Sequence, residues 1–247
     1  MAGHSQFKNI MHRKGAQDRK RAKVFTKIIR ELTVAAKTGS DPSANPRLRA
    51  AIATARAANM PKDTMERAIK KGSSGEDTTN YQEVRYEGYG PAGSAIIVEA
   101  LSDNRNRTAS ELRTIFNKND GNLGETGSVS FQFDHFGVIE FPTKDVDFDT
   151  VFEKALEAGA SDVETQNAIH IIYTEPSELH QIGEVLHKAL NTEPKKLALI
   201  WKPQVMVDLN NEQLESLDNL ISLLEDNDDV QRVFCNVSLP ENDPEDA

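Results

Sequence analysis

The chain has 247 residues, of which 38% are hydrophobic and 28% charged, and its formal net charge is −10. This length allows two or three compact domains, and no apolar run approaches the roughly 18–20 residues that a membrane-spanning helix needs. Because Cys235 is the only cysteine, an internal disulfide and a cysteine-based zinc cluster are excluded, which is typical of a protein from a reducing cytoplasm.

The N-terminus, MAGHSQFKNIMHRKG, lacks the apolar core of a secretory signal. Its richness in Lys and Arg and its lack of acids would also suit a transit peptide. The same positions, however, are also those that would lead into the first predicted helix. We therefore expect a cytoplasmic protein.

The charge is divided unevenly along the chain. Residues 1–71 contain 17 Lys and Arg against 5 Asp and Glu, whereas residues 72–247 contain 12 against 34. The net charge of −10 thus combines a basic segment of +12 with an acidic segment of −22. We expect the basic segment to form a separate domain, followed by a small polar linker, GSSGEDTTN.

Three helices are predicted in the basic segment. In the first, apolar residues recur at steps of three and four and form one stripe: Ala22, Phe25, Ile29, Leu32 and Ala36. Cations fall on the opposite side or precede the helix: Lys8, Arg13, Lys14, Arg19, Lys20, Lys23, Lys27 and Arg30. The second helix opens at Asn45-Pro46, a capping residue followed by proline at the first helical position, and exposes Arg47, Arg49 and Arg56. The third opens at Pro61 and stops at Gly72.

A helix face with charges of one sign repels itself unless it has a counter-charge. Nucleic-acid phosphate is the partner we favour, since each neutralised phosphate releases counterions. The alternative is that this face pairs with the acidic part of the same chain. Membrane binding is disfavoured, because the stripe opposite the cations is needed for the core.

The acidic segment mixes strands and helices. Strands are predicted at residues 81–90, 93–102, 168–174, 195–203, 205–209 and 230–237, together with a hairpin over 128–142 that turns near residues 135–137. Helices are predicted at residues 107–119, 147–160, 177–191 and 211–226, the first with a capping box of Thr108 and Glu111. Because hairpins intervene, we expect an α+β fold with two ferredoxin-like units, the second inserted in the first.

The predicted domains are a basic helical domain (1–75), an α/β domain (80–129 plus 204–239), an inserted α/β domain (130–203) and an acidic tail (240–247).

Two stretches of the acidic segment are candidates for binding. Arg105 and Arg107 stand where a strand gives way to a helix N-terminus, an arrangement that favours an anion. The equal alternative is that both arginines pair with nearby acids such as Asp103. In GNLGETG, Gly121, Gly124 and Gly127 lack the spacing of a phosphate-binding loop, and turns that need positive φ account for them better.

The sequence contains no GxSxG elbow, no HExxH, and no Cys with a plausible His partner. We therefore predict no catalytic site, no metal site, no cofactor and no small-molecule substrate.

The segments DRKRAKVFTKIIREL, NPRLRAAI, NMPKDTMERAIKKG, YEGYGPAG, LSDNRNRT and GETGSVSF, after the initial MAGHS, together resemble the YebC/PmpR family. The resemblance is strong over roughly residues 1–141 and thins afterwards, where LEAGA and LEDNDDVQ are recognisable. Members are described as transcriptional regulators, and a mitochondrial relative is a translational activator of a cytochrome oxidase subunit. The resemblance implies a helical N-terminal domain, two α/β domains, no enzymatic activity and a role tied to nucleic acid.

Two positions depart from the family pattern. Many members have Lys-Trp where this chain has Gln6-Phe7, and the glycine loop usually has Gly-Gly where this chain has Asp120-Gly121. The first departure removes a charge and an indole, and the second puts an acid where a loop would approach phosphate.

The target is either DNA or RNA. A DNA-binding transcriptional regulator is the leading hypothesis, following the family's usual description. The alternative is a translation factor that binds ribosomal or transfer RNA. Two observations support this alternative: no helix-turn-helix is evident in the sequence, and arginine-rich helices suit phosphates and folded RNA.

Overall fold

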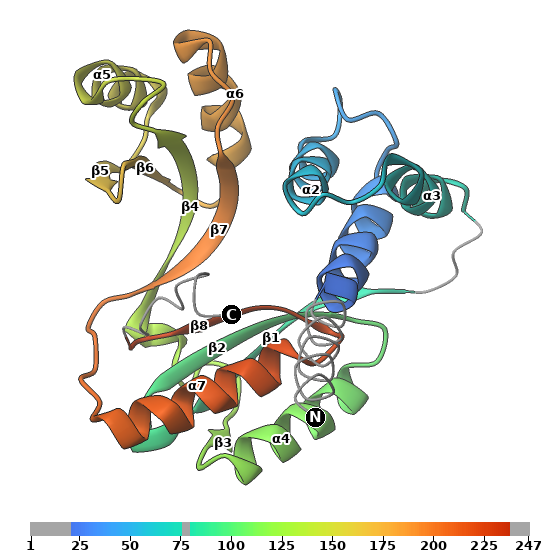
Figure 1. Ribbon diagram of the computed structural model, residues 1–247, viewed down its shortest axis with the longest axis vertical. Coiled ribbons are helices and arrows are strands. Elements are labelled where there is room, and N and C mark those ends of the chain that lie inside the picture. The colour runs from blue at the N-terminus through green and yellow to red at the C-terminus, as the bar shows by residue number, and fades with distance from the viewer. Residues whose placement is uncertain (1–20, 76–79, 238–247) are drawn as a thin grey trace, which may run out of the picture. The chain divides into compact units, whose positions relative to one another are not determined.

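The structure is a computed structural model that describes residues 21–75 and 80–237 (Figure 1). A first helix covers described residues 21–36. The other elements, in chain order, are α2 (Pro46–Ala57), α3 (Lys62–Ser73), β1 (Gln82–Tyr89), η1 (Pro91–Gly93), β2 (Ala95–Ser102), α4 (Arg105–Lys118), β3 (Asn122–Leu123), η2 (Ser130–Gln132), β4 (Phe133–Pro142), α5 (Phe148–Ala158), β5 (Asp162–Gln166), β6 (Ile169–Thr174), α6 (Leu179–Leu190), β7 (Lys196–Pro203), α7 (Asn211–Glu225) and β8 (Val230–Cys235).

The chain divides into two compact units. The first unit comprises the described residues up to Tyr86, Val98–Leu123 and Ser216–Val233. The second comprises Glu87–Ile97, Gly124–Glu215 and the described residues from Phe234 onward. Our finer division into two α/β domains with boundaries near residues 130 and 203 stays a prediction.

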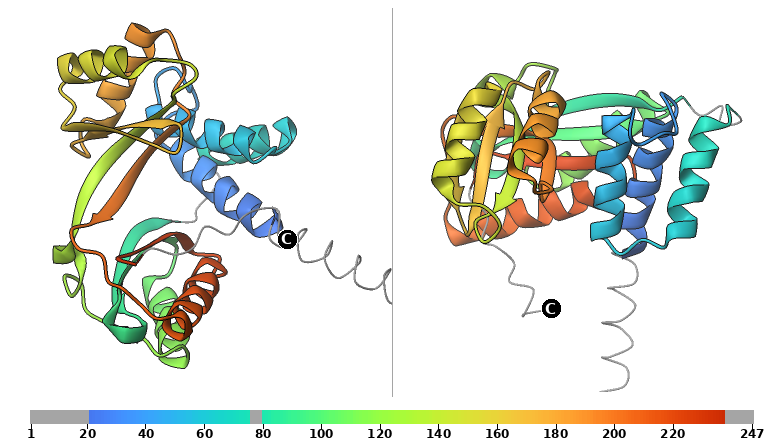
Figure 2. Two further views of the ribbon diagram at one scale, coloured as in Figure 1. Left: turned by 60° about the vertical axis from the view of Figure 1, so that its left-hand side comes forward. Right: turned by 90° about the horizontal axis from the view of Figure 1, so that it is seen from above.

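The first helix, α2 and α3 form a helical bundle, and Figure 2 shows the first helix between the other two. Its core includes Leu32, Leu48 and Met65. The predicted start of α2 is confirmed, because the Asn45 side chain accepts a hydrogen bond from the Leu48 amide at 3.0 Å. Gly72 lets α3 approach closely, since an added Cβ would lie 2.1 Å from the Thr33 carbonyl oxygen of the first helix.

The α+β fold with one sheet inserted in another is confirmed. One sheet has the strand order β3-β1-β2-β8, and the whole segment from β4 to β7 lies between β3 and β8 in the chain. The central strand β2, AIIVEALS, is almost entirely buried, as its apolar run requires. This arrangement places the N-terminus of α4 directly after β2.

The inserted segment has the element order β-α-β-β-α-β and the strand order β5-β6-β4-β7, which is ferredoxin-like. Strand β4 pairs antiparallel with β6 and β7. Helices α5 and α6 supply Val151 and Leu186 to one core with Phe141 and Ile172 of the strands. Both helices therefore cover the same face of this sheet (Figure 1).

Two local predictions are wrong for reasons of packing. The capping box at Thr108 is absent, because α4 begins earlier, at Arg105, with Asn104 as its cap. The hairpin near residues 135–137 is absent too, since β4 runs unbroken from Phe133 to Pro142. Gly137 serves a close approach instead of a turn: a Cβ there would lie 2.3 Å from the Thr174 hydroxyl oxygen and 2.8 Å from the Leu179 side chain.

Other boundaries also differ. Residues 205–209 form no strand, although the Val207 amide donates one hydrogen bond to the Asn236 carbonyl oxygen at 2.8 Å. Strands β3 and β5 were not predicted, and both are short, with two and five residues. Of the glycines in the loop before β4, only Gly127 has positive φ, at 91°, and Asp120 shares that conformation at 54°. No helix in the described ranges is long and apolar enough to cross a membrane.

Candidate nucleic-acid interface

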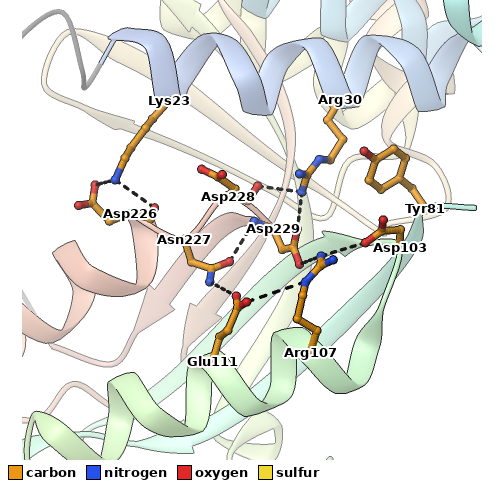
Figure 3. A pocket seen from close by; sticks show the side chains of 10 residues that line it. All are labelled: Lys23, Arg30, Tyr81, Asp103, Arg107, Glu111, Asp226, Asn227, Asp228 and Asp229. Carbon is orange, nitrogen blue, oxygen red and sulfur yellow. Dashed lines mark hydrogen bonds and ion pairs between the residues drawn. The ribbon is translucent and has the colours of Figure 1, made fainter. Parts of the chain in front are cut away.

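The cations of the first helix meet residues 225–229, which we call the acidic turn (Figure 3). The Lys23 ammonium group lies 2.9 Å from the Asp226 carboxylate. The Lys27 ammonium group donates to the Glu225 carbonyl oxygen at 2.6 Å. Burial lowers the pKa of Lys27, and the charges of Glu225 and Asp226 offset part of that effect. The acidic part of the same chain is thus the partner of these two lysines.

Asp229 is the centre of this contact. Its side chain is 5% exposed and accepts hydrogen bonds from Arg30 at 2.8 Å and Arg107 at 2.7 Å. The hydroxyls of Ser102 and Thr108 also donate to it. The carboxylate therefore joins the first helix, the end of β2 and the start of α4.

The surroundings of Asp229 favour its charged form. Burial by itself raises the pKa of this carboxyl group, but the hydrogen bonds from Thr108, Arg107, Arg30 and Ser102 outweigh burial and lower the pKa below its usual value. Hydrogen bonding to Asp229 also raises the pKa of Arg107. The network is therefore an ionised, internally satisfied cluster.

A pocket of about 600 Å³ adjoins the network. Besides the residues already named, it is lined by Tyr81, Asp103 and Glu111. The Arg30 guanidinium lies 5.0 Å from the centre of the Tyr81 ring. Because five carboxylates and only three cations line this pocket, it does not suit a phosphate group.

The structure separates the two arginines at the N-terminus of α4. Arg107 pairs with Asp103 at 2.9 Å, as the alternative hypothesis predicted, and also with Asp229. Arg105 forms no ion pair with a described residue and lines a second pocket, of about 660 Å³, together with Tyr86 and Asn106. The Tyr86 hydroxyl donates a hydrogen bond to the Arg105 carbonyl oxygen at 2.9 Å. Burial raises the pKa of this tyrosine hydroxyl.

The predicted cations of α2 also have partners. The Arg47 guanidinium forms an ion pair with the Glu31 carboxylate at 2.7 Å and a second with the Glu83 carboxylate at 2.6 Å. Arg49 donates to the Pro42 carbonyl oxygen at 2.9 Å. The remaining predicted cations lie outside the described residues: Lys8, Arg13, Lys14, Arg19 and Lys20.

Three other cations of the helical bundle are better placed to meet a phosphate. Arg56, Arg67 and Lys70 are exposed, and none forms an ion pair with a described residue. Arg67 donates only to the Asp63 carbonyl oxygen and the Thr64 hydroxyl. The sequence predicted that Arg56 is exposed, but none of the three was among the predicted contacts, which on the helical bundle were confined to the first helix and the start of α2. Asp63 precedes Arg67 and Glu66 precedes Lys70 by four residues, a spacing that favours ion pairs, yet neither pair forms among the described residues, because Arg67 donates to the Asp63 carbonyl oxygen and Glu66 pairs with Lys62.

The glycine loop is held by a buried carboxylate. Glu87 is 1% exposed and accepts hydrogen bonds from the amides of Val129 and Ser130 at 3.0 and 2.8 Å. The Tyr89 hydroxyl donates to the Ser128 carbonyl oxygen at 2.7 Å. These bonds fix residues 128–130, which directly follow the glycine loop. Across residues 21–75 and 80–237, no cluster of His, Cys, Asp and Glu has the arrangement of a metal site.

Comparison with known proteins gives matches over most of the chain. The model of the TACO1/YebC N-terminal domain matches residues 5–75, and the model of the TACO1/YebC second and third domain matches residues 81–237. The solved structure of a conserved hypothetical protein, Aq1575 from Aquifex aeolicus, is 46% identical with a TM-score of 0.76. That match covers 90% of this chain and 92% of the other. The chain belongs to the TACO1/YebC family.

Proposed function

We propose that this protein is a non-enzymatic, cytoplasmic regulator of gene expression that binds nucleic acid, in the first place a DNA-binding transcriptional regulator. One observation carries the proposal. Residues 21–75 contain 12 Lys and Arg against 4 Asp and Glu, and Arg56, Arg67 and Lys70 of this segment have no carboxylate partner among the described residues. The proposal includes no cofactor and no small-molecule substrate.

Phosphate is the counter-charge that suits such a surface. Lys and Arg gain affinity by releasing the counterions condensed on a nucleic acid. The acidic turn already neutralises Lys23 and Arg30, so the phosphate contacts fall to the exposed cations of α2 and α3. The basic residues before position 21, from Lys8 to Lys20, remain proposed contacts on sequence grounds.

Two observations support DNA as the target. The family model over residues 81–237 carries a name that abbreviates transcriptional regulation. In addition, only residues 58–61 connect α2 to α3, which is the connection length of a helix-turn-helix.

An RNA-binding translation factor is the second candidate. The exposed cations of the bundle suit phosphate groups, and phosphate contacts position a protein on nucleic acid without reading base edges. Recognition by shape and phosphate contacts is how proteins bind folded RNA.

One experiment separates the two candidates. Full-length protein is tested for retention on promoter DNA and for co-sedimentation with ribosomes, at the same salt concentration. Retention on DNA that persists at salt concentrations where ribosome association is lost supports the transcriptional role. The reverse order supports the translational role, and loss of both at low salt contradicts nucleic-acid binding altogether.

A further inference from the structure

Helix α5 exposes a row of large apolar side chains. Phe148, Phe152 and Leu156 follow one another at steps of four and are 42%, 46% and 67% exposed. The core of the inserted segment uses a neighbouring row of the same helix, with Val151 and Ala155 fully buried. The apolar sector of α5 is thus wider than the core requires.

The aromatic part of this row is held in place. The rings of Phe148 and Phe152 stack with their centres 5.7 Å apart, and the Phe148 ring lies 6.0 Å from the His170 ring. His170 is itself 3% exposed, and its ring nitrogens are hydrogen-bonded to the Thr165 hydroxyl and the Val146 carbonyl oxygen. A partner that packs here would therefore meet rings whose positions are already restricted, which reduces the entropy lost on binding.

An acidic row runs beside the apolar row. Asp149, Glu153 and Glu157 each follow an exposed apolar residue, so they lie about 100° further around the helix. Lys154 pairs with Glu157 at 2.9 Å. Asp149 and Glu153 form no ion pair with any residue the structure describes. Of the three carboxylates that border the apolar row, Glu157 alone has an ion-pair partner among the described residues, although the charge of Glu153 also raises the pKa of Lys154.

We propose that this face of α5 binds a cationic amphipathic helix of a partner protein. The partner's leucine-type side chains would cover Phe148, Phe152 and Leu156, and its lysines or arginines would pair with Asp149 and Glu153. Exposed apolar patches edged by charge mark interaction sites, and an amphipathic helix matches both rows at the same spacing. A second copy of the chain would offer another acidic row, and nucleic acid would be repelled. The partner proposed for α5 therefore belongs to a different class from that of the proposed nucleic-acid interface.

The test uses the full-length protein and a fluorescent peptide of about 14 leucines and lysines, with leucine on one helical face and lysine on the other. We expect saturable binding by fluorescence anisotropy. Phe152→Ala and Leu156→Ala should each weaken binding about tenfold, as expected for central contacts. Glu153→Lys should weaken it as well. Val205→Ala and Glu193→Lys are matched controls, since both replace exposed residues outside α5, and should leave binding unchanged.

Three results would overturn the proposal. The first is equal affinity of the wild type and of both apolar variants. The second is equal binding of a peptide in which glutamate replaces lysine or in which the order of leucines is scrambled. The third is a dimer in solution that Phe152→Ala converts to a monomer, which would make a second copy the occupant. Leu156→Ala keeps the test valid if Phe152→Ala lowers the melting temperature, because Leu156 is the most exposed of the three.

Discussion

Asp229 receives hydrogen bonds from residues that lie more than a hundred positions earlier in the chain. Replacing it by Ala would leave Arg30, whose side chain is 13% exposed, as an uncompensated charge. We expect Asp229→Ala to lower the free energy of unfolding by about 3–5 kcal/mol. Urea unfolding measures the loss. A change within about 0.5 kcal/mol, as at an ordinary surface position, would show that the network adds nothing to stability.

The same carboxylate predicts a dependence on pH. Because folding lowers the pKa of Asp229, its ionised form stabilises the protein at any pH above the ordinary carboxyl pKa of about 3.9. This contribution is lost as the pH falls through the lowered, folded-state pKa. We expect Asp229→Asn to lose less stability than the wild type between neutral and acid pH, in thermal melts at matched ionic strength. Identical acid sensitivity of the two proteins would contradict this.

The two arginines of α4 should differ in their effect on stability. Arg107 bonds both Asp103 and Asp229, whereas Arg105 pairs with neither. Since Arg107 is 43% exposed, solvent screening reduces its contribution, and we expect Arg107→Ala to cost about 1–2 kcal/mol. Arg105→Ala should stay within about 0.5 kcal/mol. Equal thermal shifts in the two variants would show that the ion pairs have no structural role.

Among the elements, α3 depends on one close contact with the first helix. An Ala at position 72 would place its Cβ against the Thr33 carbonyl oxygen, which is backbone and cannot rotate away. We expect Gly72→Ala to destabilise the protein by about 1–3 kcal/mol, although alanine favours helix. Ser73→Ala, at the exposed neighbouring position, is the control and should change little. A Gly72→Ala variant as stable as the control would contradict the packing of α3.

Hydrophobic periodicity predicted most helices and strands, because each buries one regular face. Local sequence patterns gave wrong predictions where the role of a residue is set by a contact with a residue that is distant in the chain. Thr108 resembles a helix cap, yet its hydroxyl donates to Asp229. Gly137 resembles a turn, yet it makes room for Thr174 and Leu179 within a continuous strand. Strand β5 carries no apolar alternation strong enough to detect, because it lies at the edge of its sheet.

For the molecule as a whole, the charge division could be predicted, but the pairing of charges could not. Helical spacing placed Lys23 and Lys27 away from the apolar stripe. It carried no information on the acidic turn, which lies about two hundred residues later and accepts hydrogen bonds from both lysines. The candidate interface is therefore formed by Arg56, Arg67 and Lys70, which form no ion pair within residues 21–75 and 80–237. Pairs this distant follow from the tertiary fold and leave no local pattern.

The salt dependence of nucleic-acid binding tests the central claim most directly. Full-length protein is titrated with labelled duplex DNA and with folded RNA over a series of salt concentrations. If about five phosphates are neutralised, the logarithm of affinity should fall with the logarithm of salt at a slope of about −4 to −5. Replacing Arg56, Arg67 and Lys70 by Ala should reduce the magnitude of that slope by about 2–3. Replacing Lys144 and Lys188, exposed cations of the inserted segment, should leave it unchanged. A slope near zero, or a triple variant that binds as the wild type does, would contradict the proposed interface.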